Sequence, residues 1–215
     1  GLRGAASFAD LFGDYDRSDR YRATADRIKQ GIVRHLWDDE AGRFARGLVR
    51  RDGGWMKDTT LESSLFGLFE FGVLPADDPR VVSTMEAIAH GLAVKTDIGG
   101  IARYWEDYYF RVSDDVNVAP GNPWIICTLW VAKFRIETAR TPADLESPRR
   151  TLESVARFAL PGGNLPEQLH PLEGTPLSVA PLTWSHATYV QTVCLYVRKL
   201  EQLSASESVT SGRAG

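Results

Sequence analysis

Apolar residues recur at helical spacing along most of this chain. Between residues 18 and 37 they fall three or four positions apart, as at Ala25, Ile28 and Ile32, and a Ser18 or Asp19 cap predicts a helix there. Residues 44–50 alternate and predict one short strand. The helical spacing, with breakers at the ends, predicts five further helices, over residues 60–71, 79–92, 123–138, 141–159 and 182–203.

Two long segments, residues 93–122 and 161–181, have no helical period. They contain Trp, Tyr, Arg and Glu side chains rather than the composition of a disordered segment. Loops longer than about a dozen residues in a compact domain are usually functional or disordered. We therefore expect the chemistry of this protein to lie in these two loops.

The six predicted helices fall into pairs, with the long loops before the fourth and the sixth. This order predicts an all-α fold of three antiparallel αα-hairpins and resembles one half of a twelve-helix (α/α)6 toroid. Residues 1–203 would form that half. Residues 204–215 are small and polar, and we expect them to be a flexible tail.

Composition narrows the possible partners. The formal net charge is −3 and no basic stripe is present, so we expect no nucleic acid partner. No run of about 18 apolar residues occurs, so we expect no membrane span. The start of the sequence, Gly1-Leu2-Arg3, has no signal-peptide core and reads as an internal cut or a processed end, which leaves an upstream export signal open.

Cysteine usage favours a reducing compartment. Cys127 and Cys194 each lie in an apolar run, and we expect two buried free thiols and a cytoplasmic location. The two cysteines and the four scattered histidines do not have the spacing of a zinc site, so no metal is expected.

One acid stands out in the second long loop. Glu167 lies in the string GGNLPEQ, residues 162–168, between a glycine-rich turn and a proline-rich segment. A single loop glutamate is usually a solvated acid or a helix cap. Here, however, Ser178 follows eleven residues later, and the string LTWSHA starts at Leu182.

This combination closely resembles the end of the catalytic domain in glycoside hydrolase family 15, which includes glucoamylases, glucodextranases and some trehalases. The resemblance implies that Glu167 is the general base and that Ser178 hydrogen-bonds its carboxylate. It also implies that Gln168 supports the base and that Trp184 packs nearby. No metal or organic cofactor is implied.

A second block carries the same resemblance. The strings GIARYWEDYY, residues 100–109, and GNPWIICTLW, residues 121–130, are similar to a substrate loop of the family and to the entry to an inner helix. The substrate-binding residues implied are Arg103, Tyr104, Glu106, Trp124 and Trp184. A planar guanidinium suits sugar hydroxyls, and an aromatic face suits the C–H face of a glucose ring.

Simpler interpretations of these residues stay open. Arg103 could form a surface ion pair with Glu106 or Asp107, and Trp124 could belong to the core only. Trp105, Tyr108 and Tyr109 could lie either in the core or in a pocket.

The general acid of such an enzyme is absent from this sequence. Inverting glycosidases need a protonated carboxyl group for the leaving oxygen and a carboxylate that activates water. The family's acid segment, which is rich in Trp and Glu, has no counterpart here. The chain would then supply the base and part of the sugar site, and the N-terminal half would come from the same or a second chain.

The function that follows is inverting, exo-acting hydrolysis that releases glucose from α-glucans or gluco-oligosaccharides, with the isolated half inactive. Trehalose hydrolysis on the same fold is the alternative within the family. A non-catalytic half that binds carbohydrate, or that assembles with a second chain or a second copy, is the alternative from another class.

Overall fold

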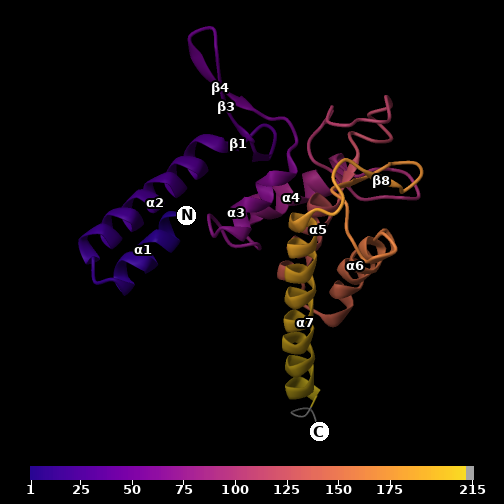
Figure 1. Cartoon of the computed structure of the whole chain (residues 1–215). Helices are drawn as coiled ribbons and strands as arrows, with labels where there is room; N and C mark the ends of the chain where they lie inside the picture. Colours follow the sequence, from indigo (N-terminus) through magenta and orange to yellow (C-terminus); the bar gives the residue numbers. More distant parts are fainter. Residues whose placement is uncertain (212–215) are drawn as a thin grey trace. The chain divides into compact units, whose positions relative to one another are not determined.

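The computed structural model describes residues 1–211 and divides the chain into two compact units, Gly1–Thr59 and Thr60–Gly215 (Figure 1). It contains seven α-helices within the described residues, and no strand there is longer than five residues. The all-α prediction agrees with this content. The count of six helices was one too low, because the helix at residues 2–11 was not predicted.

The first unit begins with a helical hairpin. Its two helices are α1 (Leu2–Leu11) and α2 (Tyr15–Leu36). The Asp14 carboxylate caps α2 by accepting a hydrogen bond from the Arg17 amide at 3.1 Å. Ser18 is buried between the helices and donates to the carbonyl of Ala6 at 3.1 Å. The prediction of a cap at Ser18 or Asp19 was therefore wrong, because Ser18 belongs to the helix interface.

Two small antiparallel strand pairs complete the first unit. The expected strand over residues 44–50 is divided between two of these strands, with a break at residues 45–46. Asp52 and Gly53 have φ values of 48° and 81°, which form the tight turn of the second pair. The strands are β1 (Trp37–Asp38), β2 (Arg43–Phe44), β3 (Gly47–Arg51) and β4 (Gly54–Asp58).

The second unit contains the remaining helices. Residues 60–71 form a 3-10 turn, η1, and a single turn of helix rather than one continuous helix. The last helix, predicted to end at residue 203, continues to Ser211, so the expected tail is partly helical and residues 212–215 lie outside the described residues. The elements are η1 (Ser63–Phe66), α3 (Gly67–Glu70), α4 (Pro79–Gly91), α5 (Ile125–Thr138), η2 (Pro142–Leu145), α6 (Glu146–Arg157) and α7 (Thr183–Ser211).

Helix α5 is the centre of the second unit. Most of its side chains are buried, and it packs against both α6 and α7 (Figure 1). Ile125 and Leu129 form a core cluster with Leu152 of α6 and with Leu165 and Leu169 of the second long loop. The loop that contains Glu167 is therefore fixed on the same core as the helix that follows the GNP motif.

The two cysteines differ in exposure. Cys127 is buried, and burial raises the pKa of its thiol above the ordinary value. Cys194 is free and exposed on α7, so the prediction of two buried thiols was wrong for this residue. Its neighbours along the helix, such as Thr192, are the ones that face inward. Within residues 1–211 no helix is both long and apolar enough to cross a membrane.

Candidate active site

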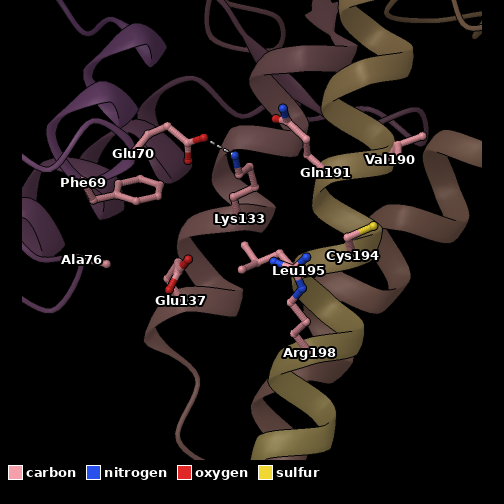
Figure 2. Close-up of a pocket in the computed structure, with 10 residues that line it drawn as sticks. All are labelled: Phe69, Glu70, Ala76, Lys133, Glu137, Val190, Gln191, Cys194, Leu195 and Arg198. Atoms are coloured by element: carbon pink, nitrogen blue, oxygen red, sulfur yellow. Dashed lines mark hydrogen bonds and ion pairs between the residues drawn. The ribbon is translucent and has the colours of Figure 1, made fainter. Parts of the chain in front are cut away.

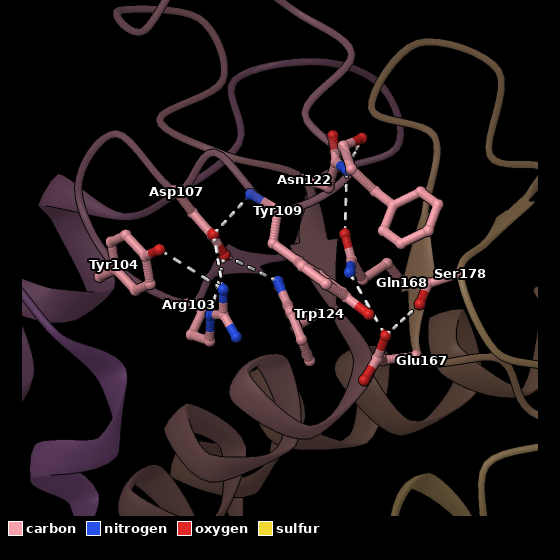
Figure 3. Close-up of polar contacts among 10 residues, drawn as sticks. Arg103, Tyr104, Asp107, Tyr109, Asn122, Trp124, Glu167, Gln168 and Ser178 are labelled. Atoms are coloured by element: carbon pink, nitrogen blue, oxygen red, sulfur yellow. Dashed lines mark hydrogen bonds and ion pairs between the residues drawn. The ribbon is translucent and has the colours of Figure 1, made fainter.

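Four short strands bring the two long loops together. They are β5 (Ile101–Ala102), β6 (Pro123–Trp124), β7 (Gln168–Leu169) and β8 (Pro176–Leu177), and they form one antiparallel sheet in that order. Ile101 pairs with Trp124, Trp124 with Gln168, and Gln168 with Leu177. Arg103, Glu167 and Ser178 each lie next to a strand of this sheet, so pairing places residues from both motifs in one neighbourhood (Figure 3).

Backbone hydrogen bonds fix Glu167 on both sides. Its amide donates to the carbonyl of Val179 at 2.8 Å, and its carbonyl accepts from the amide of Ile125 at 3.1 Å. The hydroxyl of Ser185, at the start of α7, donates to the carbonyl of Pro166 at 2.8 Å. Glu167 is therefore attached to the starts of both α5 and α7.

The two carboxylate oxygens of Glu167 differ in their hydrogen bonds. Ser178 Oγ donates a hydrogen bond to Glu167 Oε2, and Gln168 Nε2 donates to the same oxygen at 3.4 Å. Glu167 Oε1 has no hydrogen bond to any residue that the structure describes. Ser178 has a φ of 61°, an uncommon conformation for a serine, which aims its hydroxyl at the carboxylate.

A second carboxylate, Asp107, is fully occupied. Arg103 donates to it from Nη2 at 2.8 Å and from Nε at 3.0 Å, in a two-point ion pair. Trp124 Nε1 donates at 3.1 Å and the amide of Tyr109 at 3.0 Å, and Asp107 itself is 0% exposed. A Cβ added at Gly121 would lie 2.7 Å from the Asp107 Cβ, so only glycine fits beside this acid.

The guanidinium of Arg103 is enclosed by aromatic rings. It lies 4.5 Å from the centroid of the Trp124 ring, 4.9 Å from Tyr104 and 5.4 Å from Tyr109. Burial acts to lower the pKa of Arg103, but the hydrogen bonds and charge of Asp107 more than offset it, so the pKa lies above its ordinary value. Burial, and after it the charge of Asp107, raises the pKa of Tyr104.

The structure shows where the residues with simpler interpretations lie. Arg103 does pair with Asp107, but the pair is buried at its acidic end rather than lying on the surface. Trp124 is buried, with its indole N–H bonded to Asp107, and the ring is both core and support for Arg103. Tyr108 and Tyr109 are both exposed, although the ring of Tyr109 lies 6.0 Å from that of Trp124 between centroids, and Trp105 is half-buried.

Trp184 and Glu106 are not part of this polar cluster. Trp184 is 55% exposed near the start of α7, and its ring lies 5.7 Å from that of Trp130. Glu106 is exposed, has a φ of 64°, and makes no hydrogen bond or ion pair within the described residues. The implied roles of Trp184 and Glu106 in binding the substrate remain predictions.

A separate hollow lies between α3, α5 and α7 (Figure 2). Its volume is about 610 Å³, and the ion pair between Lys133 and Glu70 lies at its wall, with Glu137 and Arg198 nearby. None of the predicted site residues lines it. Among residues 1–211 there is also no group of three or more side chains suited to holding a metal ion.

Sequence reasoning missed the roles of Asp107 and Asn122. Asp107 was considered only as an ion-pair partner, and its neighbour Glu106 was assigned to the substrate. Asn122 lies inside the GNPW string, so the motif contained the signal, but no role was assigned to its side chain. In the structure Asn122 Nδ2 donates a hydrogen bond to Gln168 Oε1 at 2.9 Å (Figure 3).

Comparison with known sequences relates this chain to glycosyl hydrolases. The family model described as glycosyl hydrolases family 15 matches residues 1–149. A protein of Methanocaldococcus jannaschii, named as an uncharacterized glycosyl hydrolase, is 31% identical over 200 residues, covering 88% of this chain and 30% of the relative. A trehalase of Mycobacterium tuberculosis is 28% identical over 201 residues, covering 94% of this chain and 27% of the relative.

Comparison with solved structures identifies the fold. The crystal structure of a bacterial glucoamylase complexed with acarbose matches with a TM-score of 0.74 and 23% identity, covering 93% of this chain and 32% of that chain. The match confirms the predicted fold class, part of an (α/α)6 toroid. The chain spans about 30% of the length of these relatives.

Proposed function

Since the chain belongs to glycosyl hydrolases family 15, we propose that it supplies the general base, Glu167, of an inverting and exo-acting glucosidase. The substrates would be α-glucans or gluco-oligosaccharides, from which a terminal glucose is released. The observation that carries this proposal is the asymmetry of the Glu167 carboxylate.

That asymmetry suits a base that acts on water. Oε2 accepts from both Ser178 and Gln168, which holds the carboxylate in one orientation. Oε1 is left without a hydrogen bond among the described residues and can accept a proton. A water at Oε1 would lose that proton as it attacks the anomeric carbon, from the face opposite the leaving group. The released glucose would have the inverted, β configuration.

The Arg103 cluster supports sugar binding beside the base. Its guanidinium keeps Nη1 free of hydrogen bonds to the described residues, while Nε and Nη2 are fixed by Asp107. A fixed planar donor can bond a sugar hydroxyl without first losing side-chain freedom. Tyr104 and Trp124 hold the guanidinium by ring contacts, and in this proposal Trp184 and Glu106 contact more distant parts of the substrate.

The general acid would come from outside this chain. Asp107 cannot serve, because both its oxygens accept hydrogen bonds and the residue is fully buried. Two catalytic carboxyl groups about 6.5–9.5 Å apart are needed for inversion. We propose that the N-terminal part of a family 15 domain supplies the second one, in the same or a second polypeptide.

Exposed apolar side chains on α7 support the proposal that the N-terminal part of the domain packs against this chain. Val190 and Val197, seven residues apart and therefore on one face of the helix, are exposed, while Ser185 and Thr192 face inward. Apolar side chains left on one face of a helix usually pack against a neighbour. We expect the isolated chain to associate or to melt without cooperativity, and to be stabilised by the N-terminal part. A monodisperse monomer with a cooperative melt would contradict this, and a stable dimer would favour a second copy instead.

The stereochemistry of the product tests the proposed reaction. A complete domain that contains this chain is mixed with an aryl α-glucoside, which releases only the glucose of the cleaved bond, and the anomeric protons of that glucose are followed by NMR before mutarotation. β-Glucose as the first product is expected. α-Glucose would exclude inversion, and sugar binding with no hydrolysis by the complete domain would favour a non-catalytic role.

Trehalose hydrolysis is the second candidate, since a trehalase is 28% identical over 94% of this chain. Both activities would use the same base and differ in the residues that hold the leaving sugar. Initial rates on maltose, isomaltose, dextran and trehalose separate them. A rate on trehalose well above that on maltose would favour this second candidate.

A further inference from the structure

We propose that Asn122 is a positioning residue for the Glu167 carboxylate and acts through the side-chain amide of Gln168. The inference rests on the proposed role of Glu167 as the base. It adds a requirement from a different loop, since Asn122 ends the first long loop and Glu167 lies in the second.

The orientation of the Asn122 amide is fixed from three sides. Its Nδ2 donates to the carbonyl of Phe110 at 2.7 Å and to Gln168 Oε1 at 2.9 Å, and its Oδ1 accepts from the amide of Val112 at 3.3 Å. A flipped amide would place its oxygen against two acceptors and its NH₂ against a donor. Asn122 is 1% exposed, so water cannot readily take over any of these bonds.

The fixed Asn122 determines the orientation of Gln168. Gln168 is buried, and its Oε1 is occupied by Asn122, so its NH₂ group is the end that reaches Glu167 Oε2 (Figure 3). The opposite orientation would bring Gln168 Oε1 against a carboxylate oxygen, where both atoms are acceptors. Asn122 thereby ensures that Glu167 has a donor rather than an acceptor beside it.

This chain of contacts explains which oxygen of Glu167 stays free. Gln168 and Ser178 both hold Oε2, and each belongs to a different strand of the small sheet or its flank. Without the donor from Gln168, one hydrogen bond would have to fix the carboxylate alone. Oε1 would then spend less time where it can accept the proton of the attacking water.

Asn122→Asp is the sharpest test, because it keeps the shape of the side chain and replaces its donor by an acceptor. Gln168 would turn its NH₂ group toward the new carboxylate and its Oε1 toward Glu167. In the complete domain we expect kcat to fall about tenfold or more, in the range for a hydrogen bond to a charged group. KM should change less than about twofold, since sugar contacts are unaffected.

Asn117→Asp is the matched control. Asn117 is exposed in the same loop, so this variant adds the same charge without touching Gln168. We expect its kcat to stay within about twofold of the unaltered enzyme. An equal loss in both variants would overturn the proposal, because the effect would then come from charge alone. Asn122→Ala, which adds no charge, is measured in parallel in case Asn122→Asp does not fold.

A double-mutant cycle with Gln168→Leu separates positioning from a purely structural role. If Asn122 acts through Gln168, Asn122→Ala should lower kcat several-fold in the normal background and less than about twofold in the Gln168→Leu background. The same loss in both backgrounds would mean that Asn122 only supports the loop at Phe110 and Val112, and would overturn the proposal.

Glu167→Gln distinguishes a failure of the positioning role of Asn122 from a failure of the proposed base. An inactive Glu167→Gln enzyme with an additive cycle would leave the proposed base in place and refute the role of Asn122. An active Glu167→Gln enzyme would refute the base itself, and the positioning role with it.

Discussion

The two carboxylates of the site, Glu167 and Asp107, have opposite environments. Asp107 is fully buried and accepts four hydrogen bonds, two on each oxygen. Glu167 is half-buried and accepts two, both on Oε2. Both acids lie within short motifs, and the motifs alone do not reveal this difference.

The difference indicates what each acid does. A carboxylate whose lone pairs are all used holds its neighbours in place, but it has no free position at which to accept a proton. A carboxylate fixed through one oxygen keeps the other available at a defined position. We therefore propose that Glu167 transfers the proton and that Asp107 positions Arg103 and Trp124, and the variants below test that division.

Glu167→Gln should have the largest effect. The amide keeps the shape of the side chain but cannot take up the proton of water, and general-base catalysis is worth roughly 10²- to 10⁴-fold. We expect kcat to fall to the far end of that range, with KM and the free energy of unfolding nearly unchanged. Steady-state kinetics and denaturant titration measure both, and Glu173→Gln, an exposed acid in the same loop, is the control.

Asp107→Asn should mainly lower the stability of the domain, whereas Glu167→Gln should mainly lower kcat. The Arg103 charge would lose its partner, so we expect the free energy of unfolding to fall by about 2–4 kcal/mol. This loss lies near the lower end of the range for breaking a buried ion pair, because the Arg103 side chain is partly exposed. Denaturant titration of the complete domain measures this, with the exposed Asp114→Asn as control. Unchanged stability would show that the hydrogen bonds to Asp107 are not needed to hold the site together.

Ser178→Ala should have a smaller effect on turnover than the loss of the base. It removes one of the two donors on Glu167 Oε2, and we expect kcat to fall about tenfold, near the lower limit for a hydrogen bond to a charged acceptor. Ser178→Gly removes the same hydroxyl and fits the φ of 61° without strain, so its kcat should fall by a similar factor. A loss as large as that of Glu167→Gln would mean that Ser178 takes part in the chemistry.

Arg103→Lys should have the smallest effect. Lysine keeps the charge beside Asp107 but has no planar fork, so the two-point pair and the ring contacts with Trp124 are weakened. We expect KM to rise about fivefold with little change in kcat, as for a residue that binds the sugar in ground and transition states alike. A fall in kcat with constant KM would instead place Arg103 in the transition state.

The sequence predicted the parts of this site that short motifs define. Glu167, Ser178 and Gln168 were singled out by the resemblance of their strings to family motifs, and the structure has the implied hydrogen bond between Ser178 and Glu167. The choice between Glu106 and Asp107 could not be made in the same way. They are adjacent acids in a loop without period, and only the pairing of β5 and β6 determines which of them is buried.

The helices illustrate a similar limit. Long periodic segments such as α2 and α4 were located within a few residues, because their apolar spacing reflects the face that they bury. The exposure of Cys194 was misjudged because the direction in which α7 faces depends on its packing against α5. The apolar run around Cys194 carries no information about that direction.

The most direct test of the central claim is azide rescue of a base-deleted enzyme. Azide has no proton to lose, so it can attack the anomeric carbon of α-glucosyl fluoride without a general base. In the complete domain, Glu167→Ala with azide should form β-glucosyl azide, whereas Asp107→Ala should not, because its retained Glu167 carboxylate would repel the azide anion and leave it no space. β-Glucosyl azide from Asp107→Ala, or none from a folded Glu167→Ala, would contradict the division of roles between the two acids.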